Sequence, residues 1–275
     1  MQADRMELRQ VLESAALAAG SAIMAIHKAG ADVQYKADQS PVTMADEEAE
    51  RLILAALAQH FPDIPVVAEE AVAAGRVPDV SGGVFFLVDP LDGTKEFIAG
   101  RSEFTVNIAL IRDRAPVAGI VYAPALSTGF IADSERAERF EVDGEGAISR
   151  RQPIGCRKCG NALTAVASRS HATPETARFL DDHGIDACTA IGSSLKFCLV
   201  AQGLADVYPR FGRTMEWDTA AGDAVLRAAG GHTRTLDGAP LLYGKIQQAN
   251  DADFANPDFI AASADWSGGP AATTK

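Results

Sequence analysis

The sequence predicts a fold of mixed helices and strands in two parts, an α+β part followed by an α/β part. The first half contains a long segment rich in Ala and Leu, and then a series of short apolar runs with turn residues between them. Near residue 155 the pattern of predicted elements changes, and apolar runs begin to alternate with helical segments. The chain has 275 residues, which is enough for one large domain or two modest ones with a buried core.

The first half begins with two predicted helices. One spans about residues 6–28 and ends before Gly30, because glycine readily adopts the left-handed conformation that closes a helix. The other begins after Thr43 and runs to about residue 59, with Asp46 placed three residues after the cap, as in a capping box.

The remainder of the first half is predicted to form strands. The apolar runs are bounded by turn signals, and this arrangement indicates an antiparallel, meander-like sheet. The predicted strands are residues 64–68, 84–88, 104–111, 117–122, 129–132 and 139–142, with a short helix at 94–98.

The second half alternates between strands and helices, which is typical of α/β architecture. The predicted strands are residues 163–167, 187–191 and 205–208, and the predicted helices are 174–181, 194–202 and 219–229. We place the boundary in the stretch 150–160, which is rich in Gly, Arg and Cys. This gives an N-terminal subdomain at 1–155, which holds the antiparallel sheet and the core of the site, a C-terminal subdomain at 156–265, and a flexible tail at 266–275.

The composition limits the classes of function. A net charge of −12 argues against a nucleic-acid polymer as partner, because such binding needs a basic surface. A small phosphorylated substrate remains compatible if bound cations or a few Lys and Arg residues offset the acid where it binds. The sequence has no apolar run of about 18 residues and no signal-peptide layout, so we expect no transmembrane segment and a cytoplasmic protein. Peripheral attachment to the inner face of the cell membrane is left open.

The four cysteines do not indicate a metal or redox site. Cys156 and Cys159 form a CxxC pair, but no second pair of ligands lies nearby, and the polar flanks do not fit a thioredoxin-type helix start. We therefore expect two ordinary reduced thiols. Cys188 and Cys198 lie among apolar residues, and we expect both in the core.

Two of the predicted strands end in acidic residues. Glu69 follows residues 64–68, and Asp89 follows residues 84–88 with Asp92 three positions later. Sites in α/β-type folds are usually built at strand ends. Carboxylates brought together there would repel and raise one another's pKa unless a cation kept them ionised. Either segment alone is also compatible with a plain turn or a solvated strand end.

The donor atoms select the cation. All of these candidates offer oxygen, with no Cys or His nearby, and this favours a hard ion such as Mg²⁺ over zinc. Asp89 could bridge two ions about 3.5–4 Å apart, with Glu69 and Asp92 on either side, and such a pair clamps a phosphoryl group and activates water. Gly93 and Thr94 follow directly, and free N–H groups at a helix start there would bind phosphate oxygens.

A further carboxylate, Asp218, lies far downstream in the segment Trp217-Asp218-Thr219-Ala220-Ala221-Gly222. In isolation Asp218 is interpreted as the N-cap of an Ala-rich helix. A carboxylate there would also complete the shell of a second metal ion. The small residues that follow permit this helix to pack closely against another element.

Together these segments resemble the inositol monophosphatase superfamily of Mg²⁺-dependent, lithium-sensitive phosphatases. The resemblance rests on Glu69-Glu70, then on residues 89–94 (Asp-Pro-Leu-Asp-Gly-Thr), then on residues 217–222, and it covers about residues 6–262. It implies a layered αβαβα fold of the sugar-phosphatase type, in which the C-terminal subdomain contributes Asp218 and substrate contacts.

Other segments resemble one branch of this superfamily, the 3′(2′),5′-bisphosphate nucleotidases, which convert adenosine 3′,5′-bisphosphate to AMP and phosphate. Inositol monophosphatases usually have Thr-Asn-Phe after the Gly-Thr pair, whereas this chain has Lys95-Glu96-Phe97. The segments that match the nucleotidases are residues 36–43, 95–97, 103–107, 168–171, 192–197 and 208–212. The implied substrate is a small nucleotide bisphosphate.

The resemblance also implies the metal ligands. Glu69, Asp89 and the Leu91 carbonyl would hold one Mg²⁺, and Asp89, Asp92 and Asp218 would hold a second. A third ion in the same site is left open.

Catalytic and substrate-binding roles follow from the same resemblance. Thr94 and Asp46 would orient and deprotonate the attacking water. The side chains expected to bind the nucleotide's other phosphate or its sugar are Ser193, Lys196 and Arg210. His171 is a further candidate. The full set of expected substrate contacts is Glu69, Leu91, Asp92, Gly93, Thr94, Ser193, Lys196, Arg210 and Asp218.

Two alternative functions stay open. The nearest is another phosphatase of the same superfamily that acts on inositol phosphates or on a sugar bisphosphate. The other is a catalytically silent protein that senses a metal or nucleotide on the same scaffold, although such a protein could lose some of the acids that this chain retains. The sequence is compatible with a monomer or a homodimer.

Overall fold

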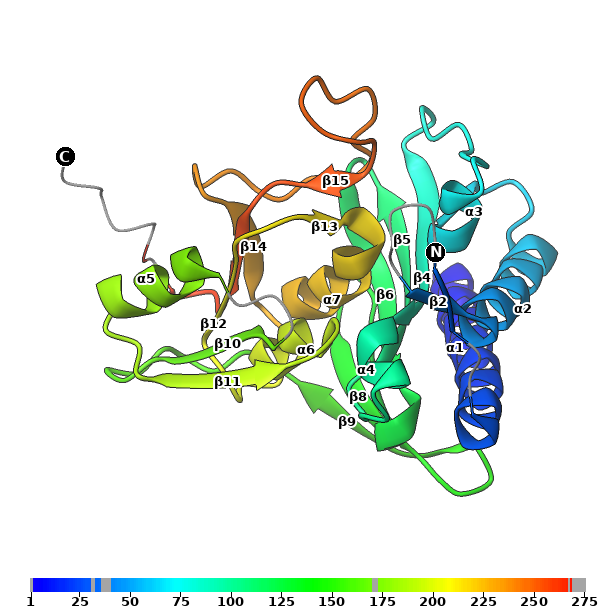
Figure 1. Ribbon diagram of the computed structural model, residues 1–275, viewed down its shortest axis with the longest axis horizontal. Coiled ribbons are helices and arrows are strands. Elements are labelled where there is room, and N and C mark those ends of the chain that lie inside the picture. The colour runs from blue at the N-terminus through cyan, green and yellow to red at the C-terminus, as the bar shows by residue number, and fades with distance from the viewer. Residues whose placement is uncertain (1, 31–32, 36–40, 170–172, 267, 269–275) are drawn as a thin grey trace.

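The structure is a computed structural model that describes residues 2–30, 33–35, 41–169, 173–266 and 268. Five layers follow one another across the molecule (Figure 1). They are helices α1 (Gln2–Ala29) and α2 (Met44–His60), a seven-stranded sheet, helices α6 (Leu195–Ala201) and α7 (Glu216–Ala228), a five-stranded sheet, and helix α5 (Pro174–Asp182). The predicted αβαβα layering is confirmed.

The seven-stranded sheet is built from consecutive strands in the order β3-β4-β5-β6-β7-β8-β9. Its strands are β3 (Val66–Ala68), β4 (Val84–Asp92), β5 (Thr105–Arg112), β6 (Ala115–Ala123), β7 (Thr128–Ala132), β8 (Ala137–Val142) and β9 (Ile148–Ile154). Only β3 and β4 pair in parallel, and the other pairs are antiparallel as predicted. The sequence did not predict β9, because it forms one edge of the sheet and exposes Arg150 and Arg151.

The five-stranded sheet has the order β11-β10-β12-β16-β14. Its strands are β10 (Thr164–Ser168), β11 (Ala187–Ile191), β12 (Val207–Arg210), β14 (His232–Thr235) and β16 (Phe259–Ala262). Strand β10 is parallel to β11 and β12, whereas β16 is antiparallel to β12 and β14. The last two strands, β14 and β16, were not predicted, so the sheet is mixed rather than parallel throughout.

Short elements complete the chain. They are β1 (Val33–Tyr35), β2 (Pro41–Thr43), α3 (Glu69–Ala73), α4 (Thr94–Ile98), the 3₁₀ turn η1 (Pro124–Leu126), β13 (Thr214–Met215) and β15 (Ala255–Asn256). The predicted helix at 94–98 has these bounds in the structure.

Helix α7 packs against both sheets, and small residues permit its close approach. A Cβ on Gly119 of β6 would lie 2.9 Å from the Ala224 side chain, and a Cβ on Gly222 would lie 2.6 Å from the Phe197 ring. The small residues after Asp218 therefore serve the packing role that the sequence indicated. These contacts hold α7 closely against β6 and α6.

The predictions for three of the four cysteines agree with the structure, and the prediction for one does not. All four are free thiols, and Cys198 is buried. Burial raises the pKa of Cys156 and of Cys159 to about 11, as expected for unreactive thiols. The prediction of Cys188 in the core is wrong, because it lies on β11, an edge strand whose residues are largely exposed.

Two predictions on the organisation of the chain remain predictions. The division at residue 155 falls between β9 and β10. Most of the tail at 266–275 lies outside the described residues. Among the described helices, none combines the length and the apolar character needed to cross a membrane.

Candidate active site

An irregularity in the sheet directs two carboxylates to one place. The ladder between β4 and β5 shifts register between Asp89, which faces Asn107, and Asp92, which faces Thr105. Bulges of this kind bend a strand and re-aim its side chains. The Leu91 N–H donates a hydrogen bond of 3.0 Å to Asp89 Oδ1, which fixes this buried carboxylate.

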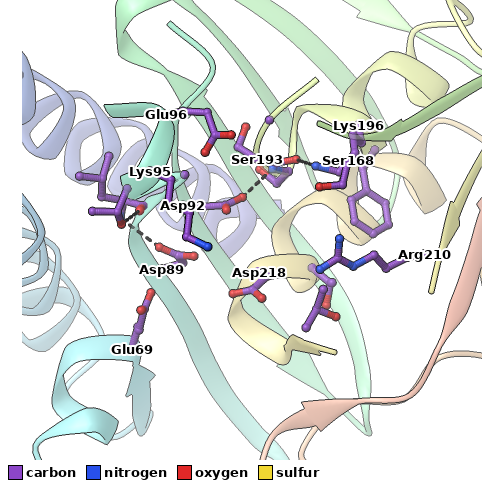
Figure 2. A pocket seen from close by; sticks show the side chains of 18 of the residues that line it. Glu69, Asp89, Asp92, Lys95, Glu96, Ser168, Ser193, Lys196, Arg210 and Asp218 are labelled. Carbon is purple, nitrogen blue, oxygen red and sulfur yellow. Dashed lines mark hydrogen bonds between the residues drawn. The ribbon is translucent and has the colours of Figure 1, made fainter. Parts of the chain in front are cut away.

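These side chains line a cavity of about 280 Å³ between β4, α4, α6 and α7. All of the predicted metal and substrate residues described by the structure are brought together in it: Glu69, Asp89, Leu91, Asp92, Gly93, Thr94, Ser193, Lys196, Arg210 and Asp218. Figure 2 shows Glu69, Asp89, Asp92 and Asp218 on one side of this space, with Lys196 and Arg210 on the other. His171 lies outside the described residues.

The acidic side brings several carboxyl groups together in a buried place, and this raises their pKa. Burial raises the pKa of Asp89 well above its usual range, and the charges of Glu69, Asp92 and Asp218 raise it further. Burial likewise raises the pKa of Asp92 to about 6 and that of Asp218 to about 8. A cation between these groups would keep them ionised at neutral pH.

The donor set fits a hard cation. The acidic side offers the carboxylates of Glu69, Asp89, Asp92 and Asp218 together with the Leu91 carbonyl, and no His or Cys among the described residues lines the cavity. No three His, Cys, Asp or Glu side chains in the described ranges are close enough to enclose one ion. Mg²⁺ suits such an open arrangement, because it retains several waters and typically takes one or two carboxylates with substrate phosphate oxygens.

The place of Asp218 differs from the prediction. Helix α7 begins at Glu216 with Met215 as its N-cap, so Asp218 is the third residue of the helix and not its cap. Its Oδ2 accepts a hydrogen bond of 2.8 Å from the Met215 N–H. This bond caps the helix at its earlier start. The first helical residue, Glu216, is buried, and its carboxylate accepts hydrogen bonds from the backbone N–H groups of Gly244 and Lys245.

Asp46 lies behind the cavity wall and contacts it through Thr94. Its Oδ2 accepts hydrogen bonds of 2.8 Å from the Thr43 N–H and hydroxyl, which confirms the predicted capping box. Its Oδ1 accepts a hydrogen bond of 3.2 Å from the Thr94 hydroxyl, which also lies 3.1 Å from the Leu91 carbonyl. Burial raises the pKa of Asp46 to about 6 against the effect of the Thr43 hydrogen bonds.

Gly93 permits the turn from β4 into α4. Its φ of 95° lies in the left-handed region, and a Cβ there would meet the Glu103 carbonyl oxygen at 3.1 Å. Only glycine adopts this conformation without strain. The residues of this turn, Asp92, Gly93 and Thr94, all line the cavity.

The cationic side consists of two buried residues. The Lys196 Nζ donates to the Ser193 carbonyl and lies 5.4 Å from the centre of the Tyr208 ring. Burial lowers the pKa of Lys196 to about 8. Arg210 is 7% exposed, and its Nε has no hydrogen-bond partner among the described residues. Arg210 lines the cavity, so its positive charge faces any anionic ligand bound there.

The sequence missed several polar residues at the site. Glu96, Ser194, Tyr208 and Thr219 line the cavity, and Asn107 contacts Asp92. One signal was available: Thr105 and Asn107 are alternate polar residues in the otherwise apolar run of β5. Such residues share one face of a strand.

Comparison with known proteins gives consistent matches. The model of the inositol monophosphatase family matches residues 4–266. The 3′(2′),5′-bisphosphate nucleotidase CysQ of Escherichia coli O157:H7 is 45% identical over 243 residues, covering 88% of this chain and 94% of that protein. The crystal structure of CysQ from Bacteroides thetaiotaomicron has a TM-score of 0.75 at 37% identity and covers 94% of this chain and 97% of that one. Inositol monophosphatase from Anabaena has a TM-score of 0.71 at 23% identity over 95% and 92% of the two chains, which is a likeness of fold.

Proposed function

The chain belongs to the inositol monophosphatase family, and from this premise we propose that it is a 3′(2′),5′-bisphosphate nucleotidase. It is a metal-dependent phosphatase that hydrolyses the 3′-phosphate of adenosine 3′,5′-bisphosphate to give AMP and phosphate. The similarity to CysQ of E. coli, at 45% identity over 88% of the chain, supports this substrate class over inositol phosphates.

One observation carries the proposal: a single cavity of about 280 Å³ has carboxylates on one side and two buried cations on the other. The acidic side suits a metal-bound phosphate, and Arg210 suits a second phosphate through a charge-assisted hydrogen bond. A nucleotide with phosphates on both its 3′ and 5′ oxygens presents two such groups. An inositol monophosphate presents only one.

We assign the metal to Mg²⁺, with two ions per site. Glu69, Asp89 and the Leu91 carbonyl would hold one ion, and Asp89, Asp92 and Asp218 would hold the other. Bound there, Mg²⁺ would neutralise the phosphoryl charge and lower the pKa of water. The oxygen-only donor set and the raised pKa of Asp89 and Asp218 support this assignment.

The chain's own residues would position the reactants. The Thr94 hydroxyl donates a hydrogen bond to Asp46 and can therefore accept one from the attacking water. As the water attacks, its proton passes to the Thr94 oxygen, and the Thr94 proton passes to Asp46. The backbone N–H groups at the Gly93 turn stabilise charge on the phosphoryl oxygens. Arg210 and Lys196 hold the end of the nucleotide that does not react.

The test is phosphate release from a panel of substrates with Mg²⁺, with and without Li⁺. Adenosine 3′,5′-bisphosphate should give the highest kcat/KM, ahead of inositol 1-phosphate and fructose 1,6-bisphosphate. Preference for either of the last two would favour another phosphatase of the family. No release from any substrate would favour a silent sensor. Asp92→Asn should abolish turnover while the protein stays folded, and near-normal activity of this variant would rule out the two-metal assignment.

A further inference from the structure

Three polar side chains lie buried between the acidic side of the cavity and helix α6. Thr105, Asn107 and Ser194 are 0%, 1% and 2% exposed. Burial of polar groups is unfavourable unless they are hydrogen-bonded, and these three satisfy one another. The Ser194 hydroxyl donates to Asn107 Oδ1 at 2.7 Å and lies 2.9 Å from the Thr105 hydroxyl.

This trio contacts Asp92. The Ser194 backbone N–H donates to Asp92 Oδ2 at 2.6 Å, and Asn107 Nδ2 approaches the same oxygen at 3.4 Å. Two donors on one oxygen fix the rotation of the carboxylate. The other oxygen, Oδ1, has no hydrogen bond to a described residue and so is left for a ligand in the cavity.

The backbone around Ser194 is itself held tightly. Ser193 has a φ of 51°, in the left-handed region, and a Cβ on Gly192 would lie 2.8 Å from the Glu103 carbonyl oxygen. The Lys196 ammonium donates to the Ser193 carbonyl and closes the turn from the opposite side. The segment that carries Ser193 and Lys196 is thus connected to Asp92 through Ser194.

We propose that Ser194 and Asn107 are positioning residues that orient the Asp92 carboxylate for its metal ion and couple it to the segment 192–196. The inference rests on the proposed function, in which Asp92 is a metal ligand. Partners that hydrogen-bond to metal ligands commonly contribute about ten- to a hundredfold to metal affinity. Asn107 fits this role, because its Nδ2 faces Asp92 and its Oδ1 is held by Ser194.

The test is metal binding by two variants, measured without substrate. Ser194→Ala removes the hydroxyl but keeps the N–H to Asp92, and Asn107→Leu replaces the amide by an apolar group of similar size. Titration with Mn²⁺ followed by electron paramagnetic resonance should show about tenfold weaker binding in each. The Mg²⁺ concentration for half-maximal phosphate release should rise by a similar factor, with kcat largely recovered at high Mg²⁺. The double variant should lose little more than either single variant, because the bonds form one network.

The control is Thr233→Val, which removes a buried hydroxyl that has no hydrogen-bond partner among the described residues and lies away from the cavity. It should bind Mn²⁺ as the wild type does. Wild-type affinity in Ser194→Ala, or a lowered melting temperature with unchanged affinity, would overturn the inference even if Asn107→Leu failed to fold. If Mn²⁺ affinity falls as expected but the wild type hydrolyses no bisphosphate, the inference stands and the proposed function fails.

Discussion

The Thr94 hydroxyl donates a hydrogen bond to the Asp46 carboxylate across 3.2 Å, and the two residues are 48 positions apart in the chain. Thr94 begins α4 at the cavity wall, whereas Asp46 is buried in the first turn of α2. The hydrogen bond thus connects the cavity wall to a buried carboxylate, which is the proton acceptor in the proposed function. The capping box fixes Asp46, so this connection is already formed before substrate binds.

Loss of this connection should lower kcat with little change in KM. General base catalysis typically contributes about 10²- to 10⁴-fold, and we expect Thr94→Val and Asp46→Asn each to lower kcat within that range. Thr94→Ser should retain most of the activity, because it keeps the hydroxyl. Steady-state kinetics with adenosine 3′,5′-bisphosphate measures both constants. The control is Thr128→Val, since Thr128 also donates to a nearby carbonyl, that of Leu126, but lies away from the cavity. Full activity of Thr94→Val would refute the role.

The acidic cluster should make the stability of the chelator-treated protein fall as pH rises. The pKa is about 6 for Asp92 and about 8 for Asp218 in the folded protein, against about 3.9 in an unfolded chain. Between these values the folded protein holds protons that the unfolded chain has released. The free energy of unfolding therefore decreases from about pH 4 to about pH 8.

Mg²⁺ replaces these protons, so its effect on the melting temperature should be larger near pH 8 than near pH 6. Thermal melts with EDTA or Mg²⁺ at the two pH values measure the difference. Asp218→Asn removes the group with the higher of the two values and should reduce the pH dependence. Equal Mg²⁺ shifts at both pH values would contradict the expectation.

Arg210 should distinguish substrates with two phosphates from those with one. A hydrogen bond to a charged group contributes about 1.5–3 kcal/mol, so Arg210→Gln should raise KM for adenosine 3′,5′-bisphosphate about ten- to a hundredfold. For adenosine 3′-monophosphate, which lacks the second phosphate, KM should change little. The comparison of the two substrates is its own control, because a general structural defect would affect both equally. An equal rise for both in a variant that keeps the wild-type melting temperature would place the second phosphate elsewhere.

Much of the fold was predictable because its core strands and helices carry strong local patterns. The capping box at Thr43 and Asp46 and the apolar runs of β4, β5 and β6 are all visible in the sequence. Three strands of the two large sheets were missed: the edge strands β9 and β14 and the interior strand β16. In β9 and β14 the exposed or half-exposed residues are mostly polar, so neither has the apolar run that predicts a strand. The pairing of β14 with β16 joins segments more than 20 residues apart, which no local pattern specifies. Exposure of Cys188 follows only from β11 forming an edge.

The site divides in the same way. The acids were found by position, because Glu69 directly follows β3 and because Asp89 and Asp92 lie in the last residues of β4. The start of α7 was misplaced, because an Asp near a helix start can be either the N-cap or the third residue of a capping box, and Asp218 takes the second position. The contacts of Asn107 and Ser194 with Asp92 depend on the meeting of β5 with the turn before α6, which the sequence alone does not specify.

Gly93 should be required for activity beyond its effect on stability. A non-glycine residue in the left-handed region costs about 1–3 kcal/mol, and at Gly93 the added Cβ would also meet the Glu103 carbonyl at 3.1 Å. We expect the strained turn to shift and to move its neighbours Asp92 and Thr94. The matched control is Gly146→Ala, since Gly146 has a φ of 83° but open space around its Cβ position. Thermal melts and phosphate release should show a loss of stability in both variants and a loss of kcat in Gly93→Ala alone. If Gly93→Ala kept wild-type kcat, the close approach at this turn would have no part in positioning Asp92 and Thr94.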